Sequence, residues 1–340
     1  MNNENNKITA VELKGESWKQ TLNTVDYSIF NTFEWIQSIS DEKTTPIYID
    51  FIDENRNLIG KISGIVLRKK GKQLYFYSGI ALSNNNETVY DNCLNALHKF
   101  ARKNRFSRIE IKNYDTYFTS TLKNKNFFQS QGVEYSIFLE EEIIINKDFK
   151  SKLKKAGKEP ITFEELKYDS ETEEKFSSLM NNTMLHRINK KHDEYDTLYI
   201  LNLTNRALKK LSDCGLGRFF AIKSSEGIHC IHFHLEKGNR AYSLLLGCDG
   251  YTYRKGLRAH LDSKLTESFK SNGFKYYNLG GIPLGRDGEG LRSYKKSAGA
   301  IPAQAFGAYT HFLVFPYSLL NPVYSAGKFI LKHKNKFFKK

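Results

Sequence analysis

One order of elements occurs twice in this chain, about 167 residues apart. In the first half, two β-prone runs (58–67 and 74–80) precede an amphipathic helical pattern and a further strand. In the second half, two β-prone runs (227–235 and 241–246) precede another helical pattern and a strand that begins near residue 274. A hairpin, a helix and a strand in each copy predict a duplicated α/β (α+β) domain with a mixed sheet.

The register of the two copies supports this interpretation. Three residue pairs lie at offsets of 167, 167 and 168: Gly60 with Gly227, Tyr75 with Tyr242, and Phe106 with Phe274. Three pairs alone are compatible with chance similarity between two α/β segments. Because the elements also follow in the same order, duplication is the favoured interpretation.

Length and charge limit the organisation and the partners. A chain of 340 residues favours two domains of ordinary size. The net charge of +15 favours phosphate-rich partners such as nucleic acid, nucleotide-linked sugars or an anionic membrane surface. Six lysines between Lys147 and Lys158 form either a solvated helix face, which is the usual case, or a phosphate-binding surface.

Other features indicate a cytoplasmic protein without a membrane span. The four cysteines show no C-x-x-C spacing, which favours reduced, mostly buried thiols over disulfides or a zinc knuckle. The first ten residues contain no apolar signal region. The apolar run 312–320 contains Pro316 and is too short to span a bilayer, so we expect a buried strand or helix there.

The segment 273–300 has the composition of a substrate site. A strand ends in the paired glycines Gly280 and Gly281, a glycine-rich loop that includes Gly285 follows, and then comes Tyr294-Lys295-Lys296. Glycines at a strand end let a ligand approach the backbone closely. A nearby lysine can hold a phosphate or stabilise an oxyanion.

Five segments together resemble the FemAB family and its GNAT-like acyltransferase relatives. They are KSKLKKAGKEPITF (150–163), TMLHRINKKH (183–192), CDGYTYRKG (248–256), YYNLGGI (276–282) and LRSYKKSAG (291–299). The resemblance covers most of the chain. It implies two tandem GNAT-like domains, each with a mixed, mostly antiparallel sheet flanked by helices, and a cleft between them.

Composition and the resemblance together give the domain limits. The first domain is expected over 1–145 and the second over 146–308, because an acidic run (140–142) and a short apolar run (143–145) give way there to a lysine-rich stretch. By resemblance, 309–340 completes the first domain. No heptad insertion lies between Glu173 and Gly215, so the chain resembles the short form without a coiled-coil arm. Such proteins transfer an aminoacyl group from aminoacyl-tRNA, or an acyl group from acyl-CoA, to an amine of a peptidoglycan peptide or an amino sugar. The expected enzyme is a monomer that needs no bound cofactor or metal.

By resemblance, Lys295 stabilises the carbonyl oxyanion or the leaving group. Arg187 and Tyr253 match positions that contact the diphosphate of a nucleotide- or lipid-linked acceptor, while Gly280, Gly281 and Tyr294 belong to the substrate site. Three departures from the family pattern are Ile39, where a phosphate-contacting lysine is expected, Gly256, where a proline is common, and Tyr294 in place of Phe. The missing lysine at Ile39 and the weak resemblance of 254–259 to an acyl-CoA pyrophosphate loop keep open the alternative of a catalytically inactive binding protein for envelope polymer or RNA.

The histidine-rich strand 229–234 offers a candidate base. Alternation places Cys230, His232 and His234 on one face. Ligands spaced two residues apart on a strand spread too far for one ion, so we expect no metal. A neutral His232 is the candidate acceptor of the amine proton, with packed or solvent-facing histidines as the alternative.

Two further patterns concern other reactions and the membrane. No G-x-S-x-G elbow or P-loop ending is present. The basic segment 328–340 is either a solvated terminus or a peripheral contact with the inner membrane surface.

Overall fold

The computed structural model describes residues 7–84, 86–115, 124–189, 200–282 and 288–323. The chain divides into two compact units. Unit 1 comprises Met1–Ile36, Ser40–Gln131 and Phe306–Lys340, and unit 2 comprises Gln37–Ile39 and Gly132–Ala305. Apart from Gln37–Ile39, the chain changes unit after residues 131 and 305, whereas the sequence placed the changes after 145 and 308.

These changes of unit fall inside strands, which explains why composition did not mark them. One lies in β7 (Phe128–Phe138) and the other in β13 (Ile301–Tyr309). The acidic run at 140–142, which suggested the boundary, belongs to the turn after β7. A continuous strand carries no loop composition at the point where it passes from one unit to the other.

Unit 1 contains a mixed, mostly antiparallel sheet. Its strand order is β1 (Thr9–Glu12), β2 (Thr44–Ile52), β3 (Leu58–Arg68), β4 (Lys72–Phe76), β6 (Arg108–Ile111) and β13, and β5 (Ala81–Leu82) pairs with β3. Among these pairs β4 and β6 run parallel. The helices are α1 (Gly15–Gln20), α2 (Phe33–Ile39) and α3 (Glu87–Lys103).

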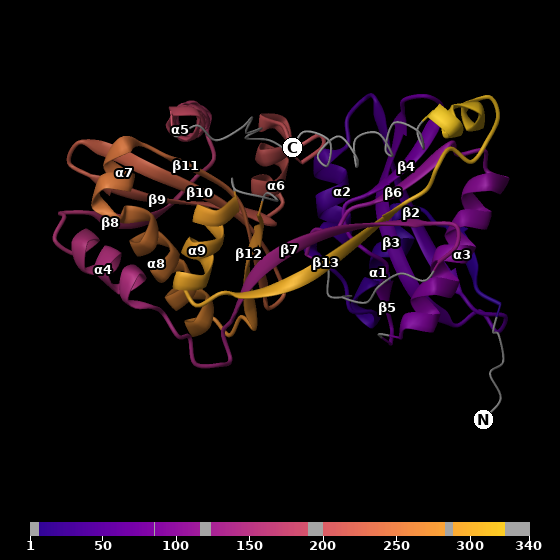
Figure 1. The fold of residues 1–340 in the computed structure, drawn as a ribbon, viewed down its shortest axis with the longest axis horizontal. Helices are drawn as coiled ribbons and strands as arrows, with labels where there is room; N and C mark the ends of the chain where they lie inside the picture. Colours follow the sequence, from indigo (N-terminus) through magenta and orange to yellow (C-terminus); the bar gives the residue numbers. More distant parts are fainter. Residues whose placement is uncertain (1–6, 85, 116–123, 190–199, 283–287, 324–340) are drawn as a thin grey trace, which may run out of the picture. The chain divides into compact units, whose positions relative to one another are not determined.

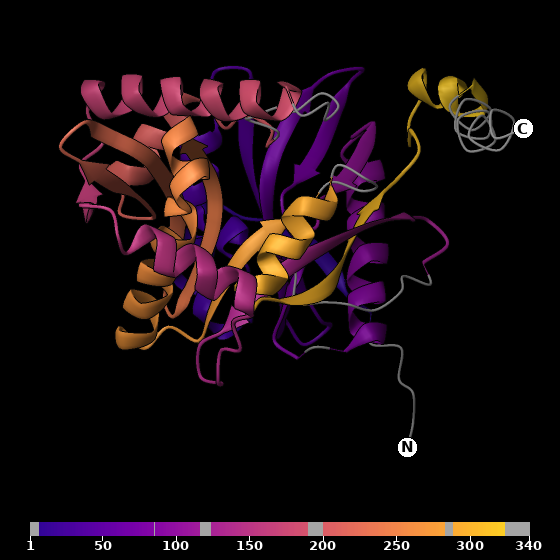
Figure 2. The same ribbon diagram turned by 60° about the vertical axis from the view of Figure 1, so that its left-hand side comes forward.

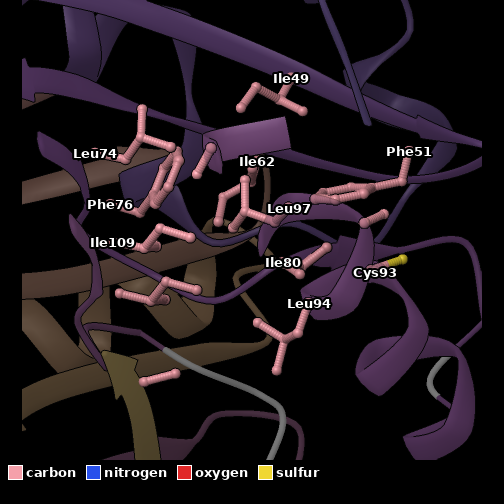
Figure 3. Packing of buried hydrophobic residues seen from close by; sticks show 14 of the residues in the cluster. Ile49, Phe51, Ile62, Leu74, Phe76, Ile80, Cys93, Leu94, Leu97 and Ile109 are labelled. Atoms are coloured by element: carbon pink, nitrogen blue, oxygen red, sulfur yellow. The ribbon is translucent and has the colours of Figure 1, made fainter. Parts of the chain in front are cut away.

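The core of unit 1 lies between the sheet and α3 (Figure 3). Asn86 caps α3, because its side chain accepts hydrogen bonds from the backbone N–H groups of Thr88 and Val89. The helix then buries Leu94 and Leu97 against alternate residues of the strands, among them Ile62, Leu74, Phe76 and Ile109.

The sheet strands of unit 2 are also mixed and mostly antiparallel. Its strand order is β7, β12 (Tyr276–Gly281), β11 (Arg240–Cys248), β10 (Gly227–Lys237), β9 (Gly217–Ser224) and β8 (Thr162–Leu166). Here β11 and β12 are the parallel pair.

Helices cover both faces of this sheet (Figures 1 and 2). The helices α5 (Ser170–Asn189) and α6 (Asn205–Asp213) pack on β9, β10 and β11. A layer of four helices comprises α4 (Lys147–Ala156), α7 (Gly250–Lys255), α8 (Leu257–Ser271) and α9 (Glu289–Ser297). In the described part of 173–215, α5 and α6 pack on the sheet and form no projecting arm.

The structure confirms the predicted fold class and the repeat. The series β3, β4, α3, β6 in unit 1 corresponds to β10, β11, α8, β12 in unit 2. In the parallel pairs, Tyr75 lies opposite Glu110 and Tyr242 lies opposite Asn278, at offsets of 167 and 168. The equivalence therefore extends to individual strand residues of the two units.

The remaining apolar run forms no membrane span. Residues 312–316 lead into the short 3₁₀ helix Tyr317–Leu320. Across the described residues, no helix is both long and apolar enough to cross a bilayer. The basic segment 328–340 lies outside the described residues, as does the loop at Gly285.

Candidate functional site

The parallel pairing of β11 and β12 is short. It joins Arg240, Ala241 and Tyr242 to Tyr276, Tyr277 and Asn278, although β11 continues to Cys248. Just beyond this point Gly280 has φ +75°, in the left-handed region that favours glycine. A Cβ there would also lie 3.3 Å from the Ser243 carbonyl oxygen. The glycine therefore lets β12 turn where its pairing with β11 ends.

Lys295 binds the end of this strand. Its Nζ donates hydrogen bonds to the carbonyl oxygens of Gly280, at 2.8 Å, and Gly281, at 2.7 Å. The side chain comes from α9 and is only 3% exposed. Burial lowers the pKa of Lys295 to about 7, and the charge of Arg258 adds to this, while Glu134 and Asp262 oppose it. The structure thus brings three predicted site residues together.

A buried carboxylate on the neighbouring strand β7 is also hydrogen-bonded near the end of β12. Glu134 of β7 accepts hydrogen bonds from the Tyr242 hydroxyl at 2.8 Å and from Asn278 Nδ2 at 3.0 Å. The Asn278 Oδ1 atom in turn accepts the Gly280 N–H at 2.8 Å. A continuous hydrogen-bonded series therefore runs from Tyr242 through Glu134, Asn278 and Gly280 to Lys295.

Tyr294 connects α9 to α8. Its hydroxyl donates to Asp262 Oδ2 at 2.6 Å, and the Arg258 guanidinium lies 4.3 Å from its ring centre. Burial raises the pKa of Asp262 even though Arg258 and Tyr294 favour its charged form. Burial also raises the pKa of Tyr294 well above its ordinary value, so the phenol stays protonated and remains a donor.

Tyr253 lies at the outer part of this group, and Arg187 follows the residue on which it stacks. Tyr253, on α7, is 37% exposed and interacts electrostatically with Arg258. Its ring stacks on His186 of α5 with centroids 4.0 Å apart and planes within 6°. Arg187 is the next residue of α5 and is half-buried. Their role in binding a diphosphate stays a prediction.

His232 lies inside unit 2. It is 1% exposed, and its Nε2 is 2.8 Å from Ser243 Oγ. The predicted alternation is present, since His234 on the same face packs on Phe269 of α8. Burial lowers the pKa of His232 well below its ordinary value, and nearby His234 and Arg258 lower it further. The ring is therefore neutral at pH 7, and its assignment as a base stays a prediction.

The α4 lysines form a charged helix face. Phe149 and Ala156 face the interior, whereas the six lysines at 147–158, five on α4 and Lys158 just after it, are exposed. Lys152 Nζ lies 5.2 Å from the Tyr294 ring centre. One member of this face thus contacts a residue of the site.

Comparison with solved structures identifies the fold. FemX has a TM-score of 0.67 at 12% sequence identity, with 93% of this chain and 99% of that chain covered. L-PGS from Bacillus licheniformis has a TM-score of 0.56 at 15% identity, with 91% and 96% covered. A tandem GNAT protein from the clavulanic acid biosynthesis pathway has a TM-score of 0.51 at 7% identity, with 90% and 98% covered.

These likenesses show that the chain has a FemAB/GNAT-like fold, as the sequence motifs predicted. In sequence, neither a protein-family model nor a curated protein matches the chain.

Sequence reasoning missed three residues that the structure places at the site. Arg258 and Asp262 stand four residues apart on a helix that is otherwise largely apolar on its buried face, and this spacing was a usable signal. Glu134 gave no comparable signal, because its partners lie 108 and 144 residues away in sequence.

Proposed function

We propose that this chain is an N-acyltransferase. It transfers an aminoacyl group from aminoacyl-tRNA, or an acyl group from acyl-CoA, to an amine of a phosphate-bearing cell-envelope precursor. The acceptor is a peptidoglycan peptide or an amino sugar of a surface polysaccharide. The observation that carries the proposal is the buried Lys295, with a pKa of about 7, bound to the strand end where the β11–β12 pairing stops.

The protonation chemistry of Lys295 fits acyl transfer. Attack of an amine on a carbonyl carbon produces a tetrahedral oxyanion, which then expels the ribose oxygen or the thiolate while the nitrogen loses a proton. An ammonium group has three N–H bonds, and Gly280 and Gly281 accept two of them. The third can donate to the oxyanion or protonate the leaving group. A pKa of about 7 lets one group serve as donor and then recover its proton near neutral pH.

The charge of the unit 2 helices supports a phosphate-bearing substrate. The α4 lysines are exposed, and Lys152 lies against Tyr294. Arg187 and Tyr253 offer a guanidinium and a phenol for a diphosphate. An affinity that falls as salt rises would indicate that phosphates are bound by these cations.

The test is transfer of label from aminoacyl-tRNA or acetyl-CoA to an amine-bearing sugar nucleotide or lipid-linked precursor. Lys295→Met should lower the rate by about 100-fold or more, because it removes a preorganised donor at the oxyanion. Lys296→Met changes the adjacent exposed lysine and should leave the rate nearly unchanged.

The outcomes separate the alternatives. Ribonuclease treatment stops transfer from tRNA, and release of a free thiol identifies an acyl-CoA donor. Binding of the precursor without turnover, with every donor, would instead identify a catalytically inactive binding protein for envelope polymer or RNA.

A further inference from the structure

We propose that Glu134 is a positioning residue that holds the end of β12 in place, so that Lys295 stays bound at the reaction site. This role rests on the proposed function. Glu134 is linked to Lys295 by hydrogen bonds through Asn278 and Gly280, and its charge also acts on the ammonium group.

The end of β12 needs such support because its pairing on one side has ended. Registered pairing with β11 stops at Asn278, and the pairing with β7 is irregular between Asn278 and Gly281. The backbone at Gly280 is left-handed and cannot continue a regular ladder. Side-chain hydrogen bonds replace the missing ladder at this point.

Each hydrogen bond in this series has a defined donor and acceptor. The Tyr242 hydroxyl and the Asn278 amide both donate to Glu134, so both carboxylate oxygens act as acceptors. The Asn278 oxygen is then oriented to accept the Gly280 N–H, and the Gly280 carbonyl accepts from Lys295. Glu134, Tyr242 and Asn278 are all buried, so a wrongly oriented group would have no water to replace its partner.

Only a carboxylate accepts both of these hydrogen bonds. A glutamine at 134 keeps both contacts only if the Tyr242 hydroxyl reverses to accept from the amide, which turns the hydroxyl's own proton away from residue 134. If the glutamine instead accepts from Tyr242, its amide nitrogen faces the donating nitrogen of Asn278. If Asn278 flips, its nitrogen faces the Gly280 N–H instead. The negative charge of Glu134 also favours the ammonium form of Lys295.

The test compares Glu134→Gln with the exchanged pair Glu134→Gln/Asn278→Asp. In the double variant an amide at 134 donates to a carboxylate at 278, which still accepts the Gly280 N–H. The hydrogen-bonded series from Tyr242 to Lys295 and the negative charge near Lys295 are then both restored. Glu226→Gln changes an exposed carboxylate of unit 2 and is the control.

The first measurement is the titration of Lys295 by NMR of protein labelled with ¹⁵N at lysine Nζ, with Lys295→Arg to assign the signal. This readout needs no substrate, so it tests the role of Glu134 even if no acyl transfer is found. We expect Glu134→Gln to move the pKa of Lys295 below about 7, and the double variant to return it toward that value.

The second measurement is the rate of acyl transfer. Glu134→Gln should lower kcat by about 10- to 100-fold with little change in KM, because small misplacement of a catalytic group has effects of this size. The double variant should recover most of the lost rate.

An unchanged Lys295 titration in Glu134→Gln overturns the proposal, as does a double variant no better than the single one. If Glu134→Gln does not fold, Tyr242→Phe tests the same series by removing one hydroxyl, and an unchanged titration there counts against the proposal.

Discussion

Two buried lysines, one in each unit, differ in their partners. Lys61 of β3 is 0% exposed and donates to Asp50 Oδ1 at 2.6 Å and Thr21 Oγ1 at 2.7 Å. Its Nζ also lies 4.9 Å from the Trp18 ring centre. Lys295 has backbone carbonyls in place of a carboxylate. A lysine paired with a carboxylate suits a structural role. Lys295 is bound to neutral carbonyls and has a pKa of about 7, so it can lose and regain a proton near neutral pH.

Removing only the lysine of the Lys61–Asp50 pair should destabilise unit 1 strongly. Lys61→Met leaves the buried Asp50 carboxyl without its ion partner, and we expect a loss of about 3 to 5 kcal/mol in the free energy of unfolding. The double variant Lys61→Met/Asp50→Leu should recover most of this loss. Urea unfolding measures both changes.

The matched control is Lys19→Met. Lys19 is paired with Glu34 at 3.1 Å, but its side chain is 46% exposed, so its removal should change stability by about 1 kcal/mol or less. An equal loss in the free energy of unfolding for Lys61→Met and Lys19→Met would show that burial adds nothing to the contribution of the Lys61–Asp50 pair.

At the scale of elements, α5 is fixed on β11 by close backbone contact. A Cβ on Gly247 would lie 2.9 Å from both Leu179 Cβ and Met180 N. Four residues beyond Leu179, Thr183 Oγ1 accepts the Cys248 N–H at 2.8 Å. The end of α5 that carries Arg187 therefore depends on a glycine in the strand beneath it.

Gly247→Ala should push α5 away from the sheet and lower the stability of unit 2 by about 1 to 3 kcal/mol, the usual effect of overpacking. Gly290→Ala is the control, because no atom lies within 4 Å of its added Cβ. Thermal unfolding, with hydrogen exchange of α5 amides, checks both. Equal protection of α5 in the two variants would contradict the expected displacement.

The elements were largely predictable from sequence, and the site only in part. Periodicity and turn residues are local signals, and they marked both copies of the hairpin, helix and strand. Lys295 and its glycines were predictable because they lie within 16 residues of one another and carry a motif. Glu134 stands between Val133 and Tyr135 in an ordinary strand, and only the folded register brings it to Asn278.

At the scale of the whole molecule, unit 1 is built from both ends of the chain. Ala308 pairs with Ile111, Thr310 Oγ1 accepts the Ile109 N–H at 3.0 Å, and the Leu313 N–H donates to the Ser107 carbonyl at 2.8 Å. These bonds complete the pairing of β6 along the edge opposite β4.

Ending the chain after Ala305 should therefore expose β6. We expect the amides of Arg108–Ile111 to lose protection from hydrogen exchange, while β10 in unit 2 keeps its protection. Exchange followed by mass spectrometry measures the two regions in one sample. Equal loss in both units would show that they do not unfold separately.

The return of the chain to unit 1 at residue 306 also sets an order for folding on the ribosome. Domains commonly fold in the order in which they are made. Here the 174 residues from Gly132 to Ala305 have all been translated before the last strand of unit 1 leaves the exit tunnel. Nascent unit 1 must therefore wait with β6 unpaired on one side, and the later-made unit 2 is the first that can be completed.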